Sequence, residues 1–313
     1  MNATPSRIVF VGVATQDAIA VVERYPGADE RVVADDVLFA GGGPAATAAV
    51  AAARLGIAVA LVAAVGDDEA GRKVIHDLHG EGVDVSGIAM VPGARTALSL
   101  VVISGPEKAR AISNLPGPAP RLDENPVGLG MIKSADWVHV DQHGWAEVHR
   151  HTDATTLTGR LSVDAGNAIP GYCQAGTALY VPTRSALVAR YGRPGDEGIE
   201  PLMRRAIADG AATVVVTSGA AGSFAMAHDG PLLHSAIPPG LIRSTLGAGD
   251  VFHGALLAGL VRLEEGTMTG GLREALEYAT VVASLSCRGV DGRSQIPRHD
   301  EVIAVTASLT HAK

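Results

Sequence analysis

Short β-branched segments alternate with helical segments along most of the chain, and this alternation limits the possible folds more than any other feature. Buried strands are expected at Ile8–Val13, Ile57–Val65, Trp137–Asp141, Leu161–Asp164, Ala178–Val181 and Thr213–Thr217. Helices are expected at Pro44–Leu55, Glu69–Leu78, Gly198–Asp209, Ala248–Leu260 and Leu272–Cys287. Strands separated by helices favour a parallel sheet covered on both faces, so the pattern predicts an α/β protein.

Two pairs of strand-like segments interrupt this rhythm. Ala18–Phe39 contains the turn YPGADE, and Ala97–Asn114 is the second such region. We expect both to form hairpins that leave the main sheet and make a small flap. The Pro- and Gly-rich stretch Gly105–Asn125 is interpreted as a loop and not as a linker, so residues 1–313 are predicted to form a single domain.

Composition excludes several classes of protein. The 313 residues carry a net charge of −8 and contain no basic run, which argues against a nucleic-acid partner. The two cysteines, Cys173 and Cys287, match no metal-ligand spacing, so we expect a reducing, cytoplasmic setting. The N-terminal run MNATPSRIVFVGVA is too short to span a membrane, and no membrane partner is expected.

The stretch STLGAGDVFHGALLAGL places small residues and one acid at the start of an apolar helix. Gly247, Ala248 and Gly249 leave backbone amides uncovered at the positive end of the helix dipole, which suits a phosphate or a developing negative charge. Asp250 would then take a proton from a hydroxyl that attacks a phosphoryl group. An alternative stays open from this stretch alone, because Asp in a first helical turn is also an ordinary dipole partner.

A second glycine cluster, GGGPAATAAVAAARLG, spans Gly41–Gly56 and allows a ligand to approach the main chain. Together the two motifs resemble the signatures of the PfkB, or ribokinase-like, carbohydrate kinases. Two further segments are similar to the family's nucleotide side, namely Val214–Phe224 (VVVTSGAAGSF) and Ala279–Pro297 (ATVVASLSCRGVDGRSQIP). The four matches occur in the family's order and cover nearly the whole chain.

The resemblance implies a ribokinase-like three-layer α/β/α sandwich with a mostly parallel central sheet and a small β-sheet lid at about 18–39 and 97–114. It also implies a sugar kinase that uses ATP and Mg²⁺. Asp250 would be the catalytic base, and the backbone of Gly247, Ala248 and Gly249 would form the anion hole. In many relatives the lids of two subunits clasp each other, so a homodimer through the lid is expected.

The resemblance also assigns binding residues. Asp17 would hold sugar hydroxyls, although an ordinary turn Asp is the alternative, and Gly42 and Gly43 would pass close to the sugar. The nucleotide would contact Thr217, Ser218, Gly219, Gly222, Thr245, Cys287 and Gly289.

The sequence departs from the family pattern at several positions. Ser244 stands where ribokinases have an Asp that helps to hold a monovalent cation, so a K⁺ site is left open. Pro182 and Ser185 replace the usual Asn-x-x-Glu motif, so magnesium would be held by the nucleotide, waters and an acid such as Asp164; no metal ligand is assigned. Ala46 replaces an Asn that holds sugar hydroxyls in many relatives, which argues against a plain ribokinase.

Within the family, the two glycine motifs look most like those of bacterial sulfofructose kinases, with ketohexokinases more distant. That likeness implies a ketose or ketose derivative, such as 6-deoxy-6-sulfofructose, as substrate. Arg31 and Asn114, placed in the lid strands, and His143 would then bind the sulfonate. For Arg31, a solvated surface charge is the alternative reading.

Two other functions and a metal site are alternatives for this chain. A dinucleotide-dependent oxidoreductase needs G-x-G-x-x-G after the first strand, and GVATQD lacks it. A metal site built from His139, His143, His149 and His151 would have no recognised spacing. A non-catalytic sugar or nucleotide sensor on a kinase fold stays open, although a sensor has no need for Asp250.

Overall fold

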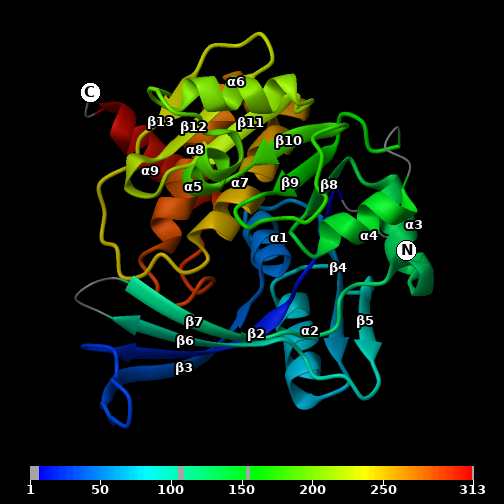
Figure 1. The fold of residues 1–313 in the computed structure, drawn as a ribbon, viewed down its shortest axis with the longest axis vertical. Coiled ribbons are helices and arrows are strands. Elements are labelled where there is room, and N and C mark those ends of the chain that lie inside the picture. Colours follow the sequence, from blue (N-terminus) through cyan, green and yellow to red (C-terminus); the bar gives the residue numbers. More distant parts are fainter. Residues whose placement is uncertain (1–6, 105–108, 153–155, 312–313) are drawn as a thin grey trace.

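The computed structural model describes residues 7–104, 109–152 and 156–311, and its body is a nine-stranded sheet (Figure 1). The strand order is β13-β12-β11-β10-β9-β8-β1-β4-β5. The strands from β11 to β5 in this order all pair in parallel, whereas β12 pairs antiparallel with both β11 and the edge strand β13. The strands are β1 Ile8–Val11, β4 Val59–Gly66, β5 Ile88–Val91, β8 Trp137–Val140, β9 Leu161–Asp164, β10 Thr177–Val181, β11 Thr213–Thr217, β12 Ser223–Ala227 and β13 Leu233–Ser235.

Strand β1 shows why the sheet is covered on both faces. Its four residues, IVFV, are all fully buried, as expected for a central parallel strand with no polar side. Ile8 and Phe10 belong to one hydrophobic core, whereas Val9 and Val11 belong to the other. Alternate side chains of this strand therefore pack into two different hydrophobic cores, one on each face of the sheet.

The helices divide between these two cores. The first core contains residues of α1 Pro44–Arg54, α2 Glu69–Gly80, α7 Ala248–Glu264, α8 Gly271–Ser286 and α9 His299–His311. The second core contains residues of α3 Pro126–Ser134, α4 Gly144–His151, α5 Arg184–Tyr191 and α6 Glu200–Ala208. The result is a three-layer α/β/α sandwich, which confirms the predicted fold class (Figure 1).

The Ala-rich helix α1 packs closely on α7, and this contact fixes one glycine motif relative to the other. A Cβ atom on Gly254 would lie 2.1 Å from the carbonyl oxygen of Ala48, so the two backbones nearly touch. Pro44 occupies the first turn of α1, where its missing amide is harmless. Small residues on both helices thus bring the N-terminal and C-terminal motifs together.

A second sheet of four strands, called the lid sheet below, has the order β3-β2-β6-β7 and projects from one side of the body (Figure 1). Its strands are β2 Thr15–Val22, β3 Ala34–Gly42, β6 Leu98–Ser104 and β7 Ala109–Leu115. β2–β3 and β6–β7 are antiparallel hairpins, and β2 and β6 pair in parallel at the centre. The two predicted hairpins therefore do leave the main sheet and join each other.

The stretch predicted as a loop, Gly105–Asn125, needs a correction. Ala109–Leu115 forms β7, which pairs with β6 as the second predicted hairpin requires, so this part of the stretch is a strand and not a loop. Residues 105–108 lie outside the described part of the chain. Within the described residues, no helix combines the length and the apolar character needed to cross a membrane.

Candidate active site

The site lies at the carboxyl ends of the parallel strands, where strand order reverses at β1 between β4 and β8. Open α/β sheets bind ligands at such a switch point. Asp141, which directly follows β8, is fully buried there. Its carboxylate accepts hydrogen bonds from the backbone amides of Val13 (2.7 Å), His143 (2.8 Å) and Gly144 (2.9 Å). These bonds join the loops that follow β1 and β8.

The start of α7 forms an anion cradle at this edge. Gly247 caps the helix with φ 72°, a left-handed conformation that favours glycine, and a Cβ there would lie 2.8 Å from Gly292 Cα. The Val251 amide donates to the Gly247 carbonyl (2.9 Å), and that of Ala248 turns toward the Thr245 carbonyl (3.3 Å). Of the three residues expected to form the anion hole, Ala248 thus has an amide that already faces a carbonyl, whereas no backbone partner among the described residues is found for the amides of Gly247 and Gly249.

Asp250 stands in the first turn of α7, beside that cradle, with part of its surface open to the site. Burial raises the pKa of Asp250 to about 7, and the negative charge of Asp164 adds to the effect. His253 and Arg293 act in the opposite direction. A carboxylate with this pKa is about half ionised near neutral pH, which suits a general base.

One turn further along α7, His253 forms a buried pair with Asp164 at the end of β9, with Nε2 to Oδ1 at 3.3 Å. Burial opposes ionisation of Asp164, but His253 and the Gly166 amide outweigh it and lower its pKa to about 2. His139 lies against His253 (ring centroids 5.1 Å apart), and burial lowers the pKa of His139 to about 3. Burial alone would lower the pKa of His253, but the charge and hydrogen bond of Asp164 outweigh it and raise that pKa.

The histidines weighed as metal ligands do not converge. His139 packs beside His253, and His149 stacks on Trp145 at 4.8 Å. Among the described residues, one trio with ligand-like geometry exists, Asp123, Glu147 and His151. Its two acids already pair with Arg121 and Arg150, so ion pairs account for the trio without a metal.

Asp17 lies in β2 on the inner face of the lid sheet and is only 8% exposed. Thr15 donates to Asp17 at 2.7 Å, and Ser99, its neighbour in β6, also hydrogen-bonds to it. Burial raises the pKa of Asp17, and these hydroxyls and Arg293 counter part of that rise. Asn114 pairs with Ser99 in β7, so a polar row runs Asp17–Ser99–Asn114 across three strands.

Each of three consecutive glycines meets a different neighbour. A Cβ on Gly41 would lie 2.2 Å from Nη1 of Arg293, and one on Gly42 would lie 2.1 Å from Oδ2 of Asp17. Gly43 has φ 92°, and a Cβ there would lie 2.4 Å from the Val13 carbonyl. The motif is therefore used for close approach of charged groups and backbone, with Asp17 held directly against Gly42.

A cavity of about 810 Å³ opens beside the start of α7. Six of the residues expected at the nucleotide line it, namely Thr217, Ser218, Gly219, Gly222, Thr245 and Cys287. Ala248 and Gly249 also line it, so the cavity reaches the anion cradle. Gly289 is not among the lining residues, because it is buried and faces the Ser294 hydroxyl, at 2.9 Å from a Cβ built there.

Arg110 is a further candidate that the motifs did not indicate. It projects from β7, lines the same cavity, and donates from Nη1 to the Thr245 hydroxyl at 2.9 Å. The lid sheet thereby contacts the C-terminal motif and places a cation at the cavity. The hairpin that carries Arg110 was predicted, but its contact with Thr245, 135 residues further along the chain, depends on how the lid sheet packs on the body.

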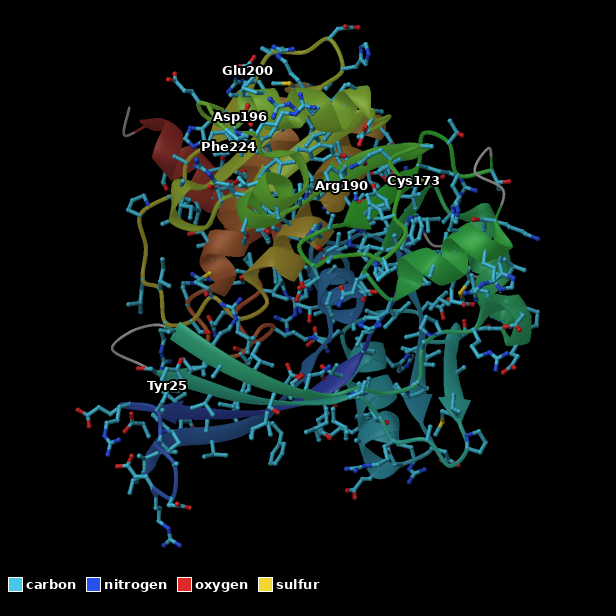
Figure 2. All side chains as sticks on the ribbon, in the orientation of Figure 1. Tyr25, Cys173, Arg190, Asp196, Glu200 and Phe224 are labelled. Carbon is cyan, nitrogen blue, oxygen red and sulfur yellow. The ribbon has the colours of Figure 1, made fainter. Side chains whose placement is uncertain are left out.

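Of the three residues predicted to bind a sulfonate, Asn114 lies in a lid strand as expected, whereas Arg31 does not. Asn114 is in the polar row, and His143 caps α4 with its side chain exposed. Arg31 is exposed and precedes β3, so it is not in a lid strand, because paired residues begin only at Ala34. Arg31 lies beyond the Val22 end of β2, which is the end farther from Asp17 and the one near Tyr25 in Figure 2. The strand spans about 17 Å between Asp17 and Val22.

The departures from the family motifs also have local explanations. Ser244 is buried, and its hydroxyl accepts the Leu246 amide at 3.1 Å. Thr183, between Pro182 and Ser185, caps α5 by accepting the Ala186 amide at 3.2 Å. Asp164 is 6% exposed, and its Oδ1 contacts His253 and accepts a hydrogen bond from the Gly166 amide. The carboxylate therefore already has partners within the protein.

Comparison with known proteins agrees with this geometry. The family model described as pfkB family carbohydrate kinase matches residues 5–298. The chain belongs to this family. As a pfkB carbohydrate kinase, it is 27% identical to mouse ketohexokinase over 304 residues, covering 91% of the chain and 98% of the relative. It is also 27% identical to Bacillus subtilis ribokinase, covering 94% and 97%.

Solved structures confirm the fold of this kinase. Ribokinase from Giardia lamblia has a TM-score of 0.84 at 20% identity and covers 98% of this chain and 100% of its own. Ribokinase from Arabidopsis thaliana, solved with ribose and ATP, has a TM-score of 0.80 at 21% identity, covering 96% and 99%. At these identities the structural likeness supports the architecture of the body and the lid sheet alone.

Proposed function

We propose that this carbohydrate kinase transfers the γ-phosphoryl group of Mg-ATP to a hydroxyl of a ketose or ketose derivative. The observation that carries the proposal is the position of Asp250. A carboxyl group with a pKa near 7 stands at the start of α7, where the anion cradle and the 810 Å³ cavity meet. Asp17 in the lid sheet and Asp250 both oppose the effect of burial on the pKa of Arg293.

In the proposed reaction, Asp250 accepts the proton of the sugar hydroxyl while the oxygen of that hydroxyl bonds to the γ-phosphorus of ATP. The bond from that phosphorus to the β–γ bridging oxygen breaks, and ADP leaves. The amides of Gly247 and Gly249 and the dipole of α7 stabilise negative charge on the phosphoryl oxygens. A general base contributes about 10²–10⁴-fold to such a rate.

Magnesium fits this site as the partner of the nucleotide. The phosphates of ATP supply hard oxygen ligands, whereas Asp164 is already matched by His253. When bound, the metal would neutralise charge on the β- and γ-phosphates. The residues of this chain then orient the sugar, exclude water and hold the proton at Asp250.

The ketose assignment is supported by the likeness to mouse ketohexokinase. The polar row Asp17–Ser99–Asn114 offers one carboxylate, one hydroxyl and one amide for sugar hydroxyls. The sulfonate hypothesis would rest on Asn114 and His143 within one subunit, with Arg31 at the distant end of the hairpin.

An ADP-release assay with Mg-ATP tests the function against a panel of sugars. The panel contains fructose, ribose, fructose 6-phosphate, tagatose 6-phosphate, sulfofructose and nucleosides. We expect turnover on a ketose, lost in Asp250→Asn. Turnover confined to an aldose or a nucleoside would overturn the ketose assignment. Nucleotide binding without turnover on any sugar would favour the alternative, a sensor on a kinase fold.

We also propose that two lids associate through their outer faces. Register places Phe39, Leu100 and Val37 on the face opposite to Asp17, and these side chains are 66%, 51% and 63% exposed. A second copy of the chain would bury this apolar face. Light scattering should give a dimer for the native chain and a monomer for Phe39→Glu; a native monomer would refute the proposal.

A further inference from the structure

The cavity beside the start of α7 differs in charge from the chain as a whole. Of the described residues that line it, Arg110 and Arg184 are charged, and no Asp or Glu is among them. The whole chain, in contrast, has 33 acidic residues against 25 basic ones. A cavity lined by cations and free of acids has a positive local field, which suits an anionic ligand.

Arg184, the first residue of α5, has no partner within the protein. Its side chain is exposed and makes no hydrogen bond or ion pair with any other residue that the structure describes. On the next helix, α6, Arg204 pairs with Glu200 and Arg205 pairs with Asp196. Because the guanidinium of Arg184 is not used in this way, all its donors are available to a ligand.

The helix that carries Arg184 forms one wall of the cavity. Arg184 and Val188 are four residues apart, so they share one face of α5, and both line the cavity. Arg110 belongs to a different wall, since it comes from β7 in the lid sheet. The two arginines therefore reach one cavity from two parts of the molecule, the body and the lid sheet.

Strand pairing places Arg184 near the anion cradle. Val181, at the end of β10, pairs with Asp164, at the end of β9. Asp164 contacts His253 of α7 at 3.3 Å, so the end of β9 touches the helix that forms the cradle. Neighbouring strands are about 4.8 Å apart, and Arg184 follows Val181 by three residues at the same edge of the sheet.

We propose that Arg184 binds the terminal phosphates of the nucleotide from the body side of the cavity, while Arg110 is the cation on the lid side. The inference rests on the proposed function, because it takes ATP as the ligand of this cavity. A guanidinium can donate two parallel hydrogen bonds to phosphate oxygens. Metal-free ATP carries more negative charge than Mg-ATP, so a fixed cation should attract it more strongly.

The test measures nucleotide affinity by calorimetry in the native chain, Arg184→Gln and Arg184→Lys, without any sugar. In Arg184→Gln, the Kd for ATP and for ADP should rise about tenfold, because a charge-assisted contact is lost. AMP lacks the terminal phosphates, so its affinity should stay unchanged. Lysine keeps the charge without the planar fork, so the Kd for ATP should rise only about threefold.

Magnesium gives a second readout from the same variants. The loss of ATP affinity in Arg184→Gln should be larger in EDTA than with Mg²⁺, because the metal neutralises part of the phosphate charge. Arg204→Gln is the matched control, since it removes an exposed arginine from α6, outside the cavity lining. We expect native nucleotide affinity in this control, which separates a local contact from a change in net charge.

An Arg184→Gln variant that binds ATP and ADP as tightly as the native chain would overturn the inference. An equal loss for AMP would also overturn it, because a distorted cavity would then explain the result, and so would a loss confined to Mg-ATP. Failure of the proposed function looks different: ATP would bind in a way that depends on Arg184, yet no sugar in the panel would be phosphorylated. A native chain that binds none of the three nucleotides would overturn both.

Discussion

Asp250→Asn should make the protein more stable at neutral pH while removing its activity. The pKa of Asp250 rises from 3.8 to about 7 in the folded chain, so folding binds a proton at this site between those values. An acid with a raised folded pKa leaves the native state progressively less stable as pH rises through that window, and the full penalty is present above about pH 7.

The magnitude follows from the size of this rise. A change from 3.8 to about 7 corresponds to about 4 kcal/mol, and solvent in the open part of the site reduces this to about 2 kcal/mol. The asparagine variant lacks the penalty, so its Tm should exceed the native value by about 4 °C above pH 7.5.

Thermal unfolding of both proteins from pH 5 to 8.5 measures this difference. More than a third of the gain in Tm should already be present at pH 5; the gain should grow until about pH 7 and should then level off. Asp36→Asn, at an exposed position of β3, is the control for general loss of negative charge. A gain that is independent of pH, or equal in the control, would refute the reasoning.

Two other changes test the binding groups. Arg110→Ala should raise KM for ATP about tenfold with little change in KM for the sugar, because it removes the lid cation that contacts Thr245 at the cavity; an unchanged KM for ATP in steady-state kinetics would contradict this. Gly42→Ala should lower kcat/KM for the sugar about a hundredfold, since a Cβ would lie 2.1 Å from the Asp17 carboxylate, while calorimetry should show native ATP affinity.

Local patterns predicted most of the parallel sheet and its main helices. The run IVFV of β1 is apolar without interruption, which is what burial on both faces requires. Pro44 marks the start of α1, and Gly56, with φ 87°, follows its end. The short helices α3, α4 and α5 and the edge strands β12 and β13 were missed, because such short segments depend on tertiary contacts for their stability.

The site was only partly predictable for a related reason. Asp250 and Gly247 lie in one continuous motif, so their relation follows from the helix that they begin. Arg110 and Ser99 reach the site through strand register, and Arg293 reaches it through packing across some 250 residues of chain. Arg31 shows the opposite error, since a position assigned to a lid strand lies outside the paired region.

The most direct test of the central claim is the single-turnover rate of phosphoryl transfer in the native chain and in Asp250→Asn, with ATP affinity measured beside it. If Asp250 is the base, the rate should fall by about 10²–10⁴-fold while ATP affinity changes little. A variant that transfers the phosphoryl group within about threefold of the native rate would contradict the assignment, because less than 1 kcal/mol of the barrier would then depend on this carboxylate.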